Sequence, residues 1–157
     1  MPVTRLNHAV LYVRDAERAA AFYRDAFGMQ IVTEMPGAAF LKAADTTNHH
    51  DLGLFALGPN APLPQPGRVG LYHLAWEVSS IEELADMATR LRDLGSLVGA
   101  SDHGVSKSLY AKDPDGNEFE VMWAVPREAW TPELESGAPV APLDLDAELA
   151  RWGAAAR

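Results

Sequence analysis

The sequence predicts an α+β protein with two tandem βαβββ modules and a C-terminal tail that carries a short helix. Three observations indicate this class. Residues 6–10 and 71–75 are matching apolar runs, each with a central histidine, and the two histidines lie 65 positions apart. Each run alternates as a strand does and precedes a capped amphipathic helix. Three further short strand-like runs then follow each helix.

The first module is expected over residues 5–58. In its opening strand, residues 5–13, alternation places His8, Val10 and Tyr12 on one face and buries the residues between them. Asp15 is a suitable N-cap for a helix that runs to Phe27, and Gly28 ends this helix because glycine accepts the left-handed conformation. Shorter strands are expected over residues 30–35, 38–44 and 51–57.

A proline-rich linker, residues 59–68, separates this module from the second, residues 69–124. The pattern then repeats: a strand over 71–78 precedes a helix from Ser80 to Leu94, with Glu83 at capping-box spacing. Strands are expected over residues 96–100, 107–112 and 118–124. Both modules are expected to form a single domain over residues 1–124, and the tail, residues 125–157, is expected to carry a helix over 144–152.

The last two strands of the second module form a hairpin whose register can be predicted. If Asp113 to Asn117 is a five-residue loop, position 112 faces 118, and 108 faces 122. Tyr110 and Glu120 are then direct cross-strand neighbours, with Cβ atoms about 5 Å apart.

Composition narrows the possible functions. The chain has 157 residues, of which 48% are apolar, and this suffices for a packed core. It has no cysteine, so disulfides, thiol nucleophiles and cysteine-ligated metals are excluded. A net charge of −9 argues against nucleic acid or an anionic membrane as a partner. The N-terminal residues show no signal-peptide pattern, and a cytoplasmic location is expected.

His8, His73 and Glu120 are the candidate metal ligands, because the histidines occupy equivalent positions of the repeat and Glu120 lies in the last strand of the second module. Two neutral imidazoles and one carboxylate form the facial triad of non-haem Fe(II) oxygenases, which leaves coordination positions open. The sequence therefore predicts a metal site.

The duplicated modules with these three residues resemble the vicinal oxygen chelate superfamily over residues 5–124. Its members include glyoxalase I, fosfomycin-resistance transferases, bleomycin-resistance proteins and extradiol ring-cleaving dioxygenases. The resemblance implies that the modules pair into one curved, partly closed mixed sheet around the metal site. It also leads us to expect a homodimer.

Further features are similar to the extradiol branch of this superfamily. Residues 52–55 offer no carboxylate as a fourth ligand, and His50 ends a double-histidine run whose second member is the acid/base. Tyr110 lies ten residues before Glu120, the spacing of the tyrosine that binds the catecholate. His103 lies in a segment that resembles one with a further active-site histidine.

The resemblance thus implies an Fe(II)-dependent dioxygenase of aromatic catabolism that acts on a catechol-like vicinal diol and O₂. Mn(II), Ni(II) or Zn(II) are alternative metals. Two other functions stay open. One is a metal-dependent lyase or transferase like glyoxalase or the fosfomycin-resistance enzymes, since the latter use the same triad. The other is a non-enzymatic drug-binding protein, because a charge of −9 suits a cationic drug.

Overall fold

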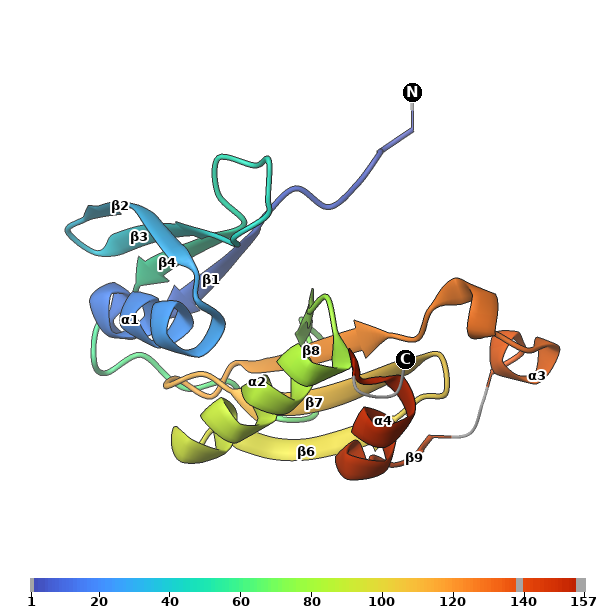
Figure 1. Ribbon diagram of the computed structural model, residues 1–157. Coiled ribbons are helices and arrows are strands. Elements are labelled where there is room, and N and C mark those ends of the chain that lie inside the picture. Colours follow the sequence, from blue (N-terminus) through green and yellow to red (C-terminus); the bar gives the residue numbers. More distant parts are fainter. Residues whose placement is uncertain (1, 138–139, 155–157) are drawn as a thin grey trace. The chain divides into compact units, whose positions relative to one another are not determined.

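The computed structural model describes residues 2–137 and 140–154 (Figure 1). Its elements follow the predicted βαβββ order twice. The first module contains β1 (Ala9–Val13), α1 (Ala16–Phe27), β2 (Gln30–Met35), β3 (Ala38–Lys42) and β4 (Leu52–Ala56). The second contains β5 (Leu74–Glu77), α2 (Ile81–Asp93), β6 (Leu97–Asp102), β7 (Ser106–Lys112) and β8 (Glu118–Ala124). The tail adds a 3₁₀ helix (Arg127–Ala129), α3 (Pro132–Glu135), β9 (Ala141–Pro142) and α4 (Leu145–Trp152).

The strands form two mixed sheets, with the orders β1-β4-β3-β2 and β5-β8-β7-β6-β9. The prediction that both modules share one sheet is wrong, because no backbone hydrogen bonds join the strands of one sheet to those of the other in the described residues. The first strand of each module pairs in parallel with the last strand of the same module. The main-chain groups on one edge of that strand are therefore paired within its own module.

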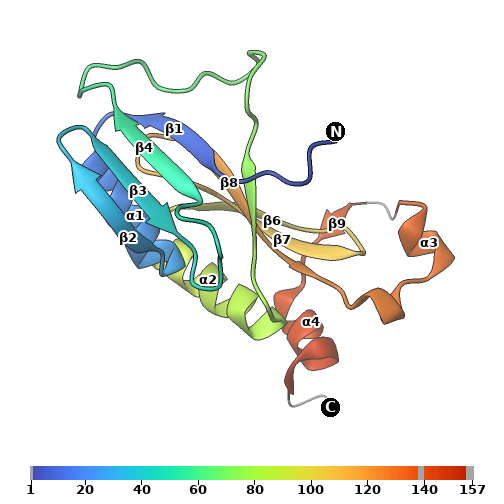
Figure 2. The same ribbon diagram turned by 90° about the horizontal axis from the view of Figure 1, so that it is seen from above.

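The described residues group into two compact units. The first unit comprises residues 1–67 with 113–116, and the second comprises 68–112 with 117–157. Each unit has its own core between a sheet and a helix. In the first unit, α1 lies along one face of the four-stranded sheet (Figures 1 and 2) and buries Ala19, Ala20 and Tyr23.

The predicted helix ends are confirmed. The Asp15 carboxylate accepts a hydrogen bond from the Arg18 amide at 3.0 Å, and Gly28 has a φ of 68°, which glycine adopts without strain. At the start of α2, the Ser80 hydroxyl accepts a bond from the Glu83 amide at 3.2 Å. The Glu83 carboxylate accepts from the Ser79 amide at 2.7 Å, one residue earlier than the usual capping box requires.

The predicted hairpin register is also confirmed. Tyr110 faces Glu120, Lys112 faces Glu118, and Ser108 faces Met122. The two opening strands are shorter than predicted. β1 begins at Ala9, opposite the first residue of β4, and β5 begins at Leu74, opposite Phe119 of β8. His8 and His73 therefore directly precede β1 and β5 instead of lying inside them.

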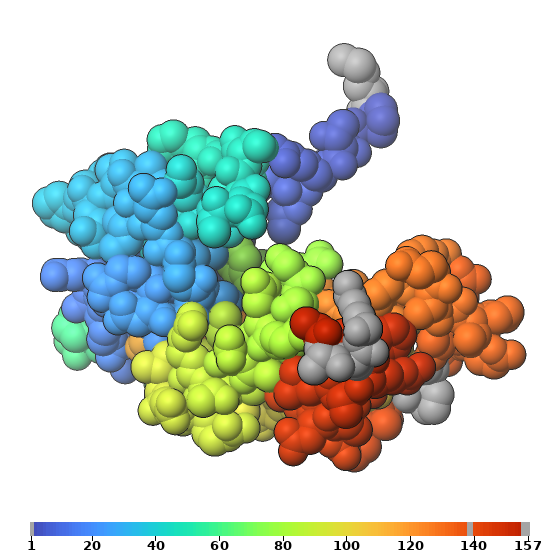
Figure 3. Space-filling model, viewed as in Figure 1, coloured from blue at the N-terminus to red at the C-terminus, as the bar shows by residue number. Residues whose placement is uncertain are grey.

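The tail is more ordered than the sequence indicated. β9 pairs with the edge strand β6, and α4 packs against α2 (Figure 3). The α4 helix confirms the prediction, whereas α3 and β9 are too short to show a periodicity in the sequence. Within the described parts of the chain, no helix is both long and apolar enough to cross a bilayer.

Candidate metal and active site

The second unit brings His73 and Glu120 together. Parallel pairing of β5 with β8 places Ala75 opposite Glu120, so the residue just before β5 lies beside the same carboxylate. The Nε2 atom of His73 is 3.1 Å from Oε2 of Glu120, and both side chains are largely buried. Two adjacent ligands of an octahedral ion with bonds of about 2.1 Å are about 3.0 Å apart. The observed spacing therefore fits two ligands of one metal ion.

Tyr110 and His103 extend this cluster within the second unit. The Nε2 atom of His103 is 2.8 Å from the Tyr110 hydroxyl, which in turn donates to Oε1 of Glu120 at 3.5 Å. The shorter contact is the stronger one. Burial, and then the charge of Glu120, raises the pKa of Tyr110, so its phenol keeps its proton and can donate. His103, Tyr110, Glu120 and His73 thus form a continuous row of polar groups.

The first unit brings His8 and His50 together. His8 precedes β1, and its ring centroid is 4.6 Å from that of His50, which lies in the loop before β4. The edge of His50 also contacts Phe40, with the centroids 5.0 Å apart. Desolvation, together with the neighbouring histidines, lowers the pKa of His50. His50 is consequently neutral at physiological pH and able to accept a proton.

The three candidate metal ligands do not form one cluster among the described residues. In residues 2–137 and 140–154, no group of three or more His, Cys, Asp or Glu side chains is arranged to hold a metal ion. The first unit contributes His8, and the second contributes His73 and Glu120. The complete triad stays a prediction.

Gly53 occupies the position of the first module that corresponds to Glu120. Val10 and Ala75 are equivalent in the repeat, and they pair with Gly53 and Glu120 respectively. A Cβ at Gly53 would lie 3.4 Å from side-chain atoms of both Phe40 and Val10, so a long side chain there would have to displace them. The strand therefore offers no fourth carboxylate at this position.

Two asparagines near the site were not identified from the sequence. The Asn7 carboxamide oxygen is 2.9 Å from Nδ1 of His8, and Asn48 bonds to Asn7. In the sequence, Asn7 could have been noticed only because it is adjacent to the candidate ligand His8. Asn48 could not have been identified from the sequence, because its hydrogen-bond partners lie up to 43 residues away.

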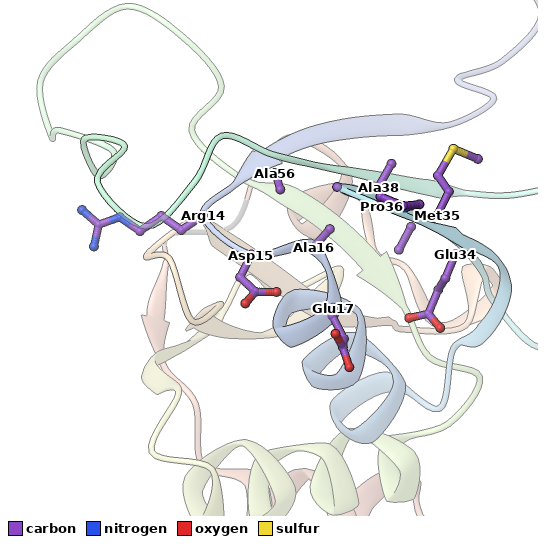
Figure 4. Close-up of a pocket in the computed structure, with 11 residues that line it drawn as sticks. Arg14, Asp15, Ala16, Glu17, Glu34, Met35, Pro36, Ala38 and Ala56 are labelled. Atoms are coloured by element: carbon purple, nitrogen blue, oxygen red, sulfur yellow. The ribbon is translucent and has the colours of Figure 1, made fainter.

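The first unit also has a hollow of about 530 Å³ between the start of α1 and the β2–β3 hairpin (Figure 4). Carboxylates from both elements line it, and none of the predicted site residues does. The lining residues are Arg14, Asp15, Ala16, Glu17, Glu34, Met35, Pro36, Gly37, Ala38, Ala39 and Ala56.

Duplicated βαβββ modules, with a histidine before each first strand and a carboxylate in the final strand, define a glyoxalase-type fold with a candidate metal site. Residues 5–121 match the family described as the Glyoxalase/Bleomycin resistance protein/Dioxygenase superfamily. The chain belongs to this superfamily.

Related proteins have different activities. The chain is 32% identical over 146 residues to a catechol-2,3-dioxygenase of Bacillus subtilis, covering 92% of this chain and 50% of that protein. It is 37% identical over 136 residues to biphenyl-2,3-diol 1,2-dioxygenase 3 of Rhodococcus globerulus, covering 82% and 70%. It is also 30% identical over 126 residues to metallothiol transferase FosB of Lysinibacillus sphaericus, covering 76% and 82%. The chain thus spans only half the length of the catechol dioxygenase.

A solved structure of similar fold is lactoylglutathione lyase from Agrobacterium tumefaciens. Its TM-score is 0.56 at 30% identity, and the match covers 78% of this chain and 96% of that one. Similarity in sequence and fold therefore extends to dioxygenases, a transferase and a lyase, and the site residues must separate these activities.

Proposed function

We propose that the protein is a metal-dependent extradiol-type dioxygenase that cleaves the ring of a catechol-like vicinal diol. The observation that carries this proposal is the row His103–Tyr110–Glu120–His73, because it places a protonated phenol beside the two candidate ligands of one ion. A phenol in this position can donate a hydrogen bond to an oxygen of a bound diol. The two dioxygenase relatives agree with this function.

His8, His73 and Glu120 would hold the metal. Two imidazoles and a carboxylate suit Fe(II), and also Mn(II), Ni(II) or Zn(II). When bound, Fe(II) would supply Lewis acidity toward the diol and open coordination positions for the substrate and O₂. This role explains why the triad leaves coordination positions open.

His50 would act as the acid and base. A neutral imidazole accepts a proton from a diol hydroxyl as the substrate binds, and returns it as the ring opens. Its ring lies against His8, the ligand that the first unit would supply. Tyr110 would orient the deprotonated diol, and His103 would hold the phenol of Tyr110 in place.

A test starts from protein purified without oxygen and loaded with Fe(II) or Mn(II). Catechol and biphenyl-2,3-diol are supplied, and O₂ uptake and the yellow ring-cleavage product are measured. The proposal requires one O₂ consumed per diol, with both atoms of ¹⁸O₂ in the product. Product without incorporation of ¹⁸O would contradict it.

A fosfomycin-type thiol transferase is the second candidate, favoured by the similarity to FosB. Such an enzyme would join a thiol to the antibiotic without O₂, and it would not need the Tyr110 phenol. The same metal-loaded protein can be assayed with fosfomycin and a low-molecular-weight thiol. Adduct formation together with no diol cleavage would replace the proposed function with this one.

A further inference from the structure

The Asn48 side chain joins two segments of the first unit through all of its hydrogen-bonding groups. Its Oδ1 accepts from Arg5 Nη2 at 2.7 Å and from Asn7 Nδ2 at 3.2 Å. Its Nδ2 donates to the Asn7 carbonyl at 2.8 Å and to Asp51 Oδ1 at 2.7 Å. A carboxamide has two donors and two acceptor lone pairs, and Asn48 uses all four.

The segments that Asn48 joins carry the two site histidines of this unit. Residues 5–8 precede β1 and lie next to the loop that leads into β4 (Figure 1). Since β1 begins at Ala9, the ladder of the sheet does not extend to His8. The bonds of Asn48 supply the link from residues 5–8 to the loop that contains His50.

We propose that Asn48 is a positioning residue, which fixes His8 against His50. It holds the backbone and the side chain of Asn7, and the Oδ1 atom of Asn7 is 2.9 Å from Nδ1 of His8. This contact orients the ring and leaves Nε2 for a ligand. The inference rests on the proposed function only in giving His8 and His50 their roles.

Groups that orient a metal ligand typically change metal affinity or activity 10- to 100-fold when they are removed. Asn48→Ala should therefore weaken metal affinity by roughly that factor. In the metal-free protein, it should also abolish the nuclear Overhauser contact between the His8 and His50 rings, whose centroids are 4.6 Å apart. Mn(II) titration by calorimetry and NMR of imidazole protons measure the two effects.

Thr46→Val is the matched control. The Thr46 hydroxyl donates to Asp51 at 2.9 Å and accepts from the Asn48 amide at 3.1 Å, so its loss loosens the same loop. The bonds from Asn48 to residues 5–8 do not involve Thr46. This control should keep the ring contact and the metal affinity even if it lowers the free energy of unfolding.

Asn48→Asp provides a second variant if Asn48→Ala does not fold, since it retains the acceptor for Arg5 and loses both donors. Either variant with the ring contact and metal affinity of the wild type would overturn the inference. Equal losses in Thr46→Val would also overturn it, by showing a general effect on the loop. If the wild type cleaves no diol, the ring contact in the metal-free protein still tests the positioning role separately.

Discussion

The Tyr110 phenol lies between the imidazole of His103 and the carboxylate of Glu120. These neighbours determine both its protonation state and the orientation of its hydroxyl group. His103 is the closer partner, at 2.8 Å. The contact with Glu120 is longer, at 3.5 Å, and leaves the hydroxyl able to turn toward a substrate. A partly buried phenol with a raised pKa is a hydrogen-bond donor over the whole physiological pH range.

Tyr110→Phe keeps the ring and its packing and removes this donor. Loss of a hydrogen bond to a charged group costs about 1.5–3 kcal/mol. We therefore expect kcat/KM for catechol to fall roughly ten- to hundred-fold. Tyr72→Phe is the control, because that exposed phenol pairs with Glu118. Equal kcat/KM in Tyr110→Phe and wild type would remove Tyr110 from the mechanism.

His50→Gln replaces the imidazole with an amide that cannot act as a general acid or base near neutral pH. Turnover should fall by roughly 10²–10⁴-fold, the usual contribution of a general acid–base group. Metal content should stay at the wild-type level, because His50 is not one of the three proposed ligands. Steady-state kinetics and metal analysis of the same preparation check both statements. Unchanged turnover would contradict the acid–base role.

At the scale of elements, a largely buried charged cluster attaches α4 to the sheet of the second unit. Lys107 is almost fully buried, with its ammonium 2.5 Å from Asp102 and 3.4 Å from Glu148 of α4. Glu148 also accepts a bond from the Trp152 indole at 2.9 Å. These groups lie on α4 and on the strands β6 and β7, so they determine where the tail helix docks.

Lys107→Met leaves two carboxylates without their cation. Removing one member of a buried ion pair costs about 3–5 kcal/mol, and the partial exposure of Asp102 argues for the lower end. We expect faster hydrogen exchange in α4 and a lower melting temperature. Lys112→Met, an exposed lysine on the same strand, should change neither. Equal exchange in both variants would contradict this role.

The same cluster predicts how tail docking depends on pH. Burial raises the pKa of Asp102, but Lys107 and the Gly104 amide outweigh burial and hold this pKa below its ordinary value. A carboxyl with a lowered folded-state pKa adds stability above its unfolded pKa, about 3.9, and loses it as the pH falls further. The protection of the α4 amides, measured relative to their intrinsic exchange rate at each pH, should therefore decrease below about pH 4. Loss of this protection already at neutral pH would contradict the role of Asp102.

At the scale of the whole molecule, local signals predicted the elements well. The N-cap residues Asp15 and Ser80 predicted the starts of both long helices. The five-residue loop predicted the cross-strand pairing of Tyr110 with Glu120. Two-residue β9 and the Asn48 bonds could not be predicted. Their partners are distant in sequence, and neither leaves a periodic pattern. The proposed triad likewise combines His8 with His73 and Glu120, which are distant from it in sequence.

The proposed metal ligands come from both units, so their role is tested with the entire chain. His8→Ala, His73→Ala and Glu120→Ala should each abolish stoichiometric metal binding. The proposed site has only these three protein ligands, so each variant would leave two. Each variant should still fold, since the first and second units have cores that exclude these residues. His49→Ala, an exposed histidine next to His50, is the matched control and should bind metal normally. Metal analysis and circular dichroism give the two measurements. Full metal occupancy in His8→Ala, with loss in the other two variants, would show that His8 is not a ligand.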